Sequence, residues 1–321
     1  MFLSRVFALI CTFVLFGSTA FAQAKDFSGF VQIRPGVSLY TELKIQDPSK
    51  PTLVLVNGLT YHTKYWTLFS TMLKPYGCNI LRFDPRGMGQ TLLRDGFPRT
   101  AFPIEEQAHD LHELTMKMGL RGPLNLLGLS YGGGLSMAFA RLYPQRVKNL
   151  ILVAPYTEPV ANADRTIKAQ IDAIRLTQPW NTATDDELYG FLLRQQVYTV
   201  NPIAEPSTLE FPLKPEGIFQ LIQGIRKYDF HKAAKFFPPR STHLVIAAMD
   251  QYIPVAMLDK FWKSVPPQAR ASRVLVQLSE HKVPESQPAF LAYWVDQILK
   301  GNPSAFKGNS YQANPLTNQM K

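Results

Sequence analysis

The pentapeptide Gly128-Leu-Ser-Tyr-Gly132 places Ser130 between two glycines, directly after the apolar run Leu124–Leu129. Glycines two residues either side of a serine permit a sharp strand-to-helix turn that lifts the hydroxyl clear of a sheet. The next amide, that of Tyr131, then lies at a helix N-terminus and can donate to a negatively charged oxygen. We predict Ser130 as a nucleophile, although a glycine-rich packing turn with an idle serine would contain the same residues.

A serine hydroxyl becomes a strong nucleophile when a base takes its proton, and an acid must hold that base in one tautomer. Histidine is the usual base. Of the six histidines, His281 alone lies just past an expected strand, at the end of Leu278-Ser-Glu-His281. We therefore predict His281 as the general base. The other histidines precede the serine, lie in the insertion described below or open a strand, and they are His62, His109, His112, His231 and His243.

Asp250 directly follows the run His243–Met249, which has the apolar composition of a buried strand. In open α/β sheets the functional groups gather beyond the carboxyl ends of the strands. We therefore predict Asp250 as the acid that orients His281. An aspartate here is also consistent with capping the helix expected to begin near Pro254.

The tetrapeptide Asn57-Gly58-Leu59-Thr60 follows the apolar run Thr52–Val56. A second amide for an oxyanion hole should come from this turn, and we predict Leu59 as its donor, with Tyr131 as the other. A plain strand-to-helix turn explains Asn-Gly equally well. The mechanism calls for no metal and no cofactor.

Apolar runs alternate along most of the chain with segments of helical periodicity. Continuous apolar runs suit strands that are buried on both faces, and the alternation predicts the α/β class, with a mostly parallel central sheet and helices on both faces. Residues 27–33 and 37–45 flank Pro35-Gly36 and predict an opening hairpin. Further strands are expected at 52–56, 79–83, 124–129, 147–153, 243–249 and 273–278, and helices at 66–73, 104–118, 135–142, 255–265 and 288–299.

This alternation stops between residues 156 and 239, where three amphipathic helices are expected at 163–176, 184–197 and 215–228. We predict a core formed by 25–155 and 240–300, with 156–239 as an inserted helical cap. Residues 301–321 are polar and lack periodicity, which predicts a mobile C-terminal tail.

The N-terminal residues differ in composition from the rest. Arg5 precedes an apolar run that ends at Phe16, and small residues follow up to Ala24. The run is about half the length that spans a bilayer. We predict residues 1–24 as a signal peptide, cleaved after Ala22 or Ala24, and a secreted or periplasmic protein without a stable membrane anchor. An uncleaved anchor is the alternative.

The chain is basic, with a formal net charge of +10. Excess positive charge favours acidic surfaces such as anionic lipid or cell-envelope polymers. No run of Lys and Arg and no nucleic-acid-binding motif is present, so we expect no nucleic-acid partner. Only Cys78 survives signal removal, and the protein must rely on its core rather than on an internal disulfide.

Taken together, these motifs resemble the α/β-hydrolase superfamily, in the branch with one cap insertion that includes esterases, lipases, lactonases and carbon–carbon-bond hydrolases. The resemblance covers about residues 27–300. It is carried by Asn57-Gly58 in place of the family's His-Gly, Asp84-Pro-Arg86-Gly87-Met-Gly89, the Ser130 turn, Asp250-Gln-Tyr-Ile-Pro254 and His281-Lys-Val-Pro-Glu-Ser-Gln-Pro288.

The resemblance implies Ser130, Asp250 and His281 as a catalytic triad and Leu59 and Tyr131 as oxyanion donors. It also implies that Asp84 and Arg86 hold a turn rather than react. Two departures concern the pocket entrance: Asn57 replaces the usual histidine, and Gln90-Thr91 stands where the family often has a small serine-containing stretch.

A serine at the nucleophile position disfavours dehalogenases and epoxide hydrolases, which the family builds on aspartate. Acyl transfer to water is then the expected reaction, on a small ester-like substrate whose apolar group suits the apolar faces of the cap helices. Amide, peptide or lactone hydrolysis by the same triad is an alternative, as is a non-catalytic binding protein on this scaffold. The sequence does not indicate an oligomeric state.

Overall fold

The computed structural model describes residues 26–159, 161–199, 215–301 and 308–321. The predicted signal peptide, residues 1–24, lies outside the described residues. Within them, none of the helices is both long enough and apolar enough to cross a membrane.

The described strands form one twisted sheet with the order β1-β2-β4-β3-β5-β6-β7-β8-β9-β10. All pairings from β4 to β9 are parallel, whereas β1, β2 and β10 pair antiparallel with their neighbours. The predicted fold class, a mostly parallel α/β sheet, is confirmed. The strands are β1 (Phe27–Arg34), β2 (Val37–Lys44), β3 (Thr52–Val56), β4 (Asn79–Asp84), β5 (Leu124–Leu129), β6 (Val147–Val153), β7 (Thr242–Ala247), β8 (Arg270–Val276), β9 (Asn309–Asn314) and β10 (Gln319–Met320).

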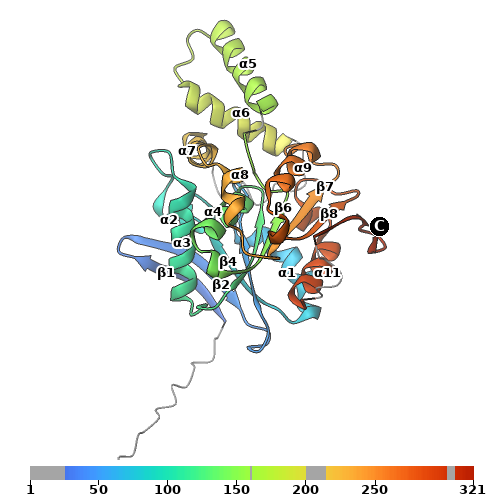
Figure 1. Ribbon diagram of the computed structural model, residues 1–321. Coiled ribbons are helices and arrows are strands. Elements are labelled where there is room, and N and C mark those ends of the chain that lie inside the picture. Colours follow the sequence, from blue (N-terminus) through green and yellow to red (C-terminus); the bar gives the residue numbers. More distant parts are fainter. Residues whose placement is uncertain (1–25, 160, 200–214, 302–307) are drawn as a thin grey trace, which may run out of the picture.

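Helices cover both faces of the sheet (Figure 1). On one face α3 (Ile104–Lys117), α4 (Tyr131–Leu142) and α9 (Val255–Ser264) pack into one apolar cluster, and on the other face α1 (Thr67–Leu73) and α11 (Pro288–Leu299) pack into a second. Because both faces are covered, every residue of β5 and of β7 is buried. This burial explains the continuous apolar runs of the central strands.

The C-terminal tail departs from the sequence-based expectation. Residues 309–314 form β9, which pairs in parallel with β8, and β10 then folds back on β9. Ala313 is fully buried and the Tyr311 ring packs edge-on against Trp294 of α11. The expectation of a mobile tail is thus corrected for this segment, because the open edge of β8 supplies backbone partners that a polar sequence does not reveal.

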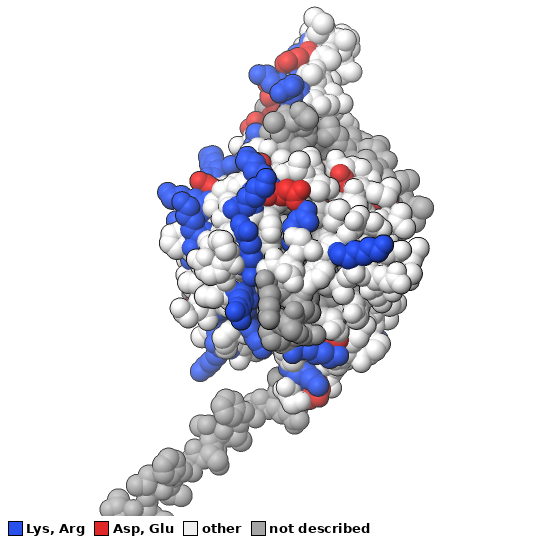
Figure 2. Space-filling model, turned by 45° about the vertical axis from the view of Figure 1, so that its right-hand side comes forward, with Lys and Arg blue, Asp and Glu red and all other residues white. Residues whose placement is uncertain are grey.

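Among the described residues between β6 and β7 are the α-helices α5 (Ala161–Thr177), α6 (Asp185–Thr199), α7 (Pro215–Arg226) and α8 (Phe230–Ala233). The helix α7 packs closely on the core, since a Cβ placed on Gly224 would lie 1.6 Å from the carbonyl oxygen of Phe102. In contrast, α5 and α6 project away from the globular body (Figures 1 and 2). They share a small apolar cluster of their own, made by Ile167, Ile171 and Leu188.

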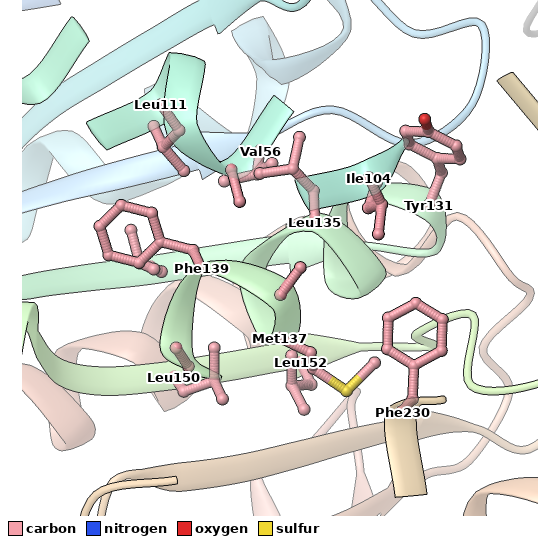
Figure 3. Close-up of a cluster of buried hydrophobic side chains, with 14 of the residues drawn as sticks. Val56, Ile104, Leu111, Tyr131, Leu135, Met137, Phe139, Leu150, Leu152 and Phe230 are labelled. Atoms are coloured by element: carbon pink, nitrogen blue, oxygen red, sulfur yellow. The ribbon is translucent and has the colours of Figure 1, made fainter. Parts of the chain in front are cut away.

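The cluster around α4 fixes the position of the turn that carries Ser130. Phe139 and Met137 of α4 lie among Leu150 and Leu152 of β6 and Phe230 of α8 (Figure 3). Burial of a large apolar side chain contributes about 1.5–3 kcal/mol. The start of α4 is therefore held rigidly at the carboxyl end of β5.

Candidate active site

Ser130 occupies the sharp turn between β5 and α4, where the sequence predicted it. Its backbone angles are φ 52° and ψ −115°, a left-handed conformation that L-residues other than glycine rarely adopt. Such a conformation costs about 1–3 kcal/mol and persists only where its surroundings impose it. They do so here: the Ser130 amide donates to Val153 O at 3.0 Å, and its carbonyl accepts from the amide of Tyr156 at 2.9 Å.

The two flanking glycines are required by backbone contacts. A Cβ on Gly128 would lie 2.3 Å from the carbonyl oxygen of Gly132. A Cβ on Gly132 would lie 2.2 Å from Val56 O and 2.5 Å from Asn57 O. The first turn of α4 thus passes directly alongside the backbone that leaves β3, which brings the turn containing Leu59 close to Ser130.

Asp250 and His281 are joined by a hydrogen bond, with His281 Nδ1 2.8 Å from Asp250 Oδ2. The other carboxylate oxygen accepts from the amides of Tyr252 and Ile253, each at 2.8 Å. The Asp250 side chain is fully buried. A carboxylate fixed in this way can hold the imidazole in a single tautomer and leave Nε2 as the nitrogen that takes up a proton.

The alternative role of Asp250, capping the following helix, is only partly fulfilled. Asp250 caps the turn at Tyr252 and Ile253, whereas α9 begins after Pro254 without a side-chain cap. A second link joins the loops that carry the two residues, since the Met249 amide donates to Ser279 O at 2.9 Å. The turn therefore serves to aim the carboxylate at His281.

Ser130, Asp250 and His281 follow β5, β7 and β8, three strands of one parallel array. The carboxyl ends of parallel strands lie at one edge of the sheet, so the three predicted residues share that edge. The structure thus brings the three residues to one edge of the sheet and joins two of them, His281 and Asp250, by a hydrogen bond. The catalytic roles themselves stay predictions.

The predicted oxyanion donors lie on two adjoining turns. Tyr131 is the first residue of α4, and the amides of a first helical turn have no partner within the helix. Its phenol oxygen accepts a hydrogen bond from Gln107 Nε2 at 2.5 Å, which anchors the residue from α3. Leu59 lies in a turn closed by the bond from the Tyr61 amide to Gly58 O at 3.1 Å, with Thr60 at φ 67°.

Asp84 anchors the loops behind the site. Its carboxylate accepts hydrogen bonds from the amides of Thr63 (2.7 Å) and Gln90 (2.9 Å) and from Asn57 Nδ2 (3.2 Å), and burial raises its pKa to about 7. Asn57 in turn accepts from Trp66 Nε1 at 2.7 Å. The asparagine that replaces the family's histidine thus belongs to the scaffold of this loop.

Arg86 is also structural. Its guanidinium pairs with Asp110 at 2.7 Å and lies over the ring of Phe102, 4.0 Å from the ring centroid. These contacts join the β4–α2 loop, which precedes α2 (Gly89–Asp95), to α3. Asp84 and Arg86 therefore hold turns, as the resemblance implied.

Sequence reasoning missed one group of residues beside His281. Tyr252 packs edge-on against the imidazole, with 5.1 Å between ring centroids. Tyr61 donates its phenol proton to Glu285 Oε1 at 2.6 Å, and Lys282 lies above the Tyr61 ring. Each of them lies within four positions of a predicted site residue, but only the folded chain shows which of them touch one another.

Two of the histidines that were not predicted as the base are buried and hydrogen-bonded within the structure. His243 is buried within β7 and its Nδ1 lies 2.8 Å from Ser272 Oγ, and burial lowers its pKa to about 3. His62 is buried, and its Nδ1 accepts from the Lys64 amide at 3.3 Å. Among the described residues, no group of three or more potential ligands could hold a metal ion.

Comparison with known proteins identifies the family. The model of the family described as "alpha/beta hydrolase fold" matches residues 51–288, which is well over half of the chain. The chain belongs to the α/β-hydrolase fold family. Solved structures support this α/β-hydrolase architecture: an esterase from Thermogutta terrifontis superposes with a TM-score of 0.62 over 86% of this chain and 98% of that one, at 20% identity.

A second solved structure, the enol-lactonase from Burkholderia xenovorans, is similar with a TM-score of 0.64 and 17% identity, over 84% of this α/β-hydrolase and 99% of that chain. Relatives by sequence match shorter regions. The proline iminopeptidase of Saccharolobus solfataricus is 29% identical over 127 residues, 38% of this chain and 40% of the relative. The (lyso)-N-acylphosphatidylethanolamine lipase of Bos taurus is 33% identical over 129 residues, 40% of this chain and 36% of the relative. The chain thus matches about two fifths of the length of these relatives.

Proposed function

We propose that this α/β-hydrolase is an exported serine hydrolase that cleaves carboxylic esters through Ser130, His281 and Asp250. One observation carries the proposal: the imidazole of His281 is bonded at 2.8 Å to a buried Asp250 carboxylate whose other oxygen is already fixed by two amides. A buried, oriented Asp–His pair on the same sheet edge as a strained serine turn suits nucleophilic catalysis.

In this mechanism Ser130 Oγ attacks the ester carbonyl while His281 Nε2 takes the hydroxyl proton. The amides of Leu59 and Tyr131 donate to the oxygen that becomes negatively charged. His281 then gives the proton to the departing alcohol, which leaves an acyl group on Ser130. Water repeats the sequence with His281 as base and releases the acid. Asp250 stabilises the imidazolium at both stages.

The choice of an ester with an apolar group rests on the surroundings of Leu59. Leu59 packs against the apolar cluster formed by Leu92 and the fully buried Ile218 of α7, and Phe97 packs against the same cluster. The inserted helix α7 therefore lies beside the turn that would bind the carbonyl oxygen. Apolar side chains here would contact the acyl or alcohol group of a substrate and make the insertion a determinant of specificity.

Amide or peptide hydrolysis is the second candidate, favoured by the similarity to a proline iminopeptidase. It would use the same triad and differs in the need to protonate an amine leaving group. A binding protein on the same scaffold would not need the paired His281 and Asp250.

A fluorophosphonate probe followed by substrate comparison tests the proposal. The probe should label wild-type protein at Ser130, and p-nitrophenyl esters of increasing chain length should be turned over faster than aminoacyl amides. Faster turnover of the amides would replace the ester proposal by the peptidase one. Absence of both labelling and turnover in folded protein would favour the alternative that the protein binds a ligand without catalysis.

Export is tested separately. Mass spectrometry of protein recovered from the periplasm or medium should find an N-terminus at Gln23 or Lys25, whereas a chain with Met1 in the membrane fraction would contradict export.

A further inference from the structure

The turn between α5 and α6 presents two large apolar side chains to solvent. Leu176 is 84% exposed and Trp180 is 76% exposed. We call residues 176–184 the hairpin tip. It lies on the part of the protein that projects from the globular body (Figure 1), and on the face seen in Figure 2 the outermost atoms of that projection belong to uncharged residues.

The residues that border the hairpin tip form one salt bridge and a short acidic stretch, Asp185–Glu187. Residues 176–184 contain no Asp, Glu, Lys or Arg. The flanking residues Arg175 and Asp185 form a salt bridge of 2.7 Å across the base of the tip. Entry of residues 176–184 alone into a less polar medium would desolvate no charged side chain, and Asp186 and Glu187 in the first turn of α6 limit how deeply the tip can insert.

Polar groups of the tip are also bonded internally. The guanidinium of Arg175 donates to the carbonyl oxygens of Asn181 (3.1 Å) and Ala183. The amide of Asn181 donates to Gln178 O at 2.9 Å, and Asn181 Oδ1 accepts from the Ala183 amide at 3.0 Å. A loop with its backbone groups satisfied in this way loses little when water is removed from around it.

A second copy of the chain fits this surface poorly. A stable dimer usually buries about 800 Å² on each partner, whereas the tip offers two large apolar side chains on a convex turn. A lipid surface fits better. Tryptophan is enriched at the boundary between headgroups and acyl chains, and shallow insertion of apolar side chains anchors peripheral proteins. The formal net charge of +10 attracts the protein as a whole to anionic lipid at long range, although the acidic residues 185–187 lie next to the tip.

We propose that the hairpin tip docks the protein reversibly on anionic lipid surfaces, with Leu176 and Trp180 entering the interface. The proposal goes beyond the catalytic one and does not rest on it. Two side chains give a peripheral, reversible attachment rather than a stable anchor.

Tryptophan fluorescence reports on the tip selectively. Of the four tryptophans, Trp66 and Trp294 are fully buried and Trp262 is 7% exposed, so Trp180 dominates the solvent-accessible emission. Phosphatidylcholine vesicles containing about 30% phosphatidylglycerol should shift the emission to shorter wavelength and protect it from acrylamide. Trp180→Phe should abolish both changes while retaining most of the binding. Unchanged emission and quenching of wild-type protein with bound vesicles would overturn the proposal.

Vesicle sedimentation measures the affinity. The double variant Leu176→Ser/Trp180→Ser should partition roughly a hundredfold more weakly, because removal of each large apolar contact changes an equilibrium by about tenfold or more. Leu316→Ser is the matched control, since Leu316 is 76% exposed but lies beyond β9. All proteins must share one N-terminus, fixed by mass spectrometry. Equal partitioning of the double variant and the control would overturn the proposal. Sedimentation velocity without lipid tests for a second copy of the chain. If wild type and Leu316→Ser self-associate and the double variant does not, the tip binds a second copy instead of lipid.

Discussion

The phenol oxygen of Tyr61 lies 2.6 Å from Oε1 of Glu285, and this hydrogen bond joins two loops that are 224 residues apart in the chain. Tyr61 closes the turn that presents Leu59, and Glu285 follows His281 by four positions. The bond therefore ties the proposed oxyanion turn to the loop of the proposed base. Burial raises the pKa of both partners, so the bond lies away from bulk water.

Removal of this hydroxyl should impair the chemical step. Tyr61→Phe leaves the buried Glu285 carboxyl without its donor, which costs about 1–3 kcal/mol at a buried site. We expect kcat on a p-nitrophenyl ester to fall by roughly tenfold with little change in KM, since the two loops lose their mutual orientation rather than their shape.

The control is Tyr143→Phe, which removes a phenol hydroxyl bonded to His109 at 2.5 Å, away from the three triad positions. It should leave kcat unchanged. The acidic limb of the pH profile adds a second readout, because loss of a donor to Glu285 raises the pKa of that carboxyl further. A Tyr61→Phe enzyme with normal kcat and an unshifted profile would show that the bond is only structural.

The proposed triad predicts a graded set of losses. Ser130→Ala and His281→Ala should each lower kcat by roughly 10⁴ to 10⁶, and Asp250→Asn by a similar or smaller factor, because members of a triad act as a unit. Glu280→Gln, next to the base, should retain most activity. Circular dichroism must show that each variant is folded. Near-normal turnover in Ser130→Ala or His281→Ala would refute the mechanism, whereas normal turnover in Asp250→Asn would reassign only the acid.

The packing of Leu59 against the cluster of Leu92 and Ile218 predicts that Ile218 influences substrate preference. Ile218→Ala should enlarge the apolar space next to the oxyanion turn and raise kcat/KM for long-chain relative to short-chain esters by about tenfold. Ile171→Ala is the matched control, because Ile171 is buried between α5 and α6 and not against Leu59. Equal preference profiles for the two variants would mean that α7 does not line the substrate site.

The sequence predicted those parts of the fold that a local pattern encodes. The bounds of β3, β5 and β6 agree with the predicted runs, because strands buried on both faces are mostly apolar. The strand β9 was not predicted, since its sequence Asn-Ser-Tyr-Gln-Ala-Asn is polar and pairing with β8 makes it a strand. The triad positions had local signals at strand ends. The bond between Tyr61 and Glu285 had none, because only the folded sheet brings those loops together.

His243 predicts how stability depends on pH. Burial lowers its pKa from an ordinary value of 6.5 to about 3, so the folded protein keeps it neutral where the unfolded chain binds a proton. The contribution of neutral His243 to the free energy of unfolding is complete above about pH 6.5. It is lost as pH falls toward 3, because between these values the unfolded state binds more protons than the folded state. From about pH 7.5 to about pH 5 this residue alone should lower the free energy of unfolding by about 2 kcal/mol.

Urea unfolding of wild type and His243→Gln at both pH values isolates the contribution of His243 to the free energy of unfolding. Glutamine keeps a polar group near Ser272 Oγ but does not titrate, so the variant should be less stable at the higher pH and lose about 2 kcal/mol less on acidification. The comparison cancels the opposite contribution of Asp84, whose raised pKa of about 7 adds stability as pH falls. His109→Gln, an exposed histidine in α3, should behave like wild type. If His243→Gln and wild type lose the same free energy between the two pH values, the buried imidazole is not what makes the folded protein sensitive to acid.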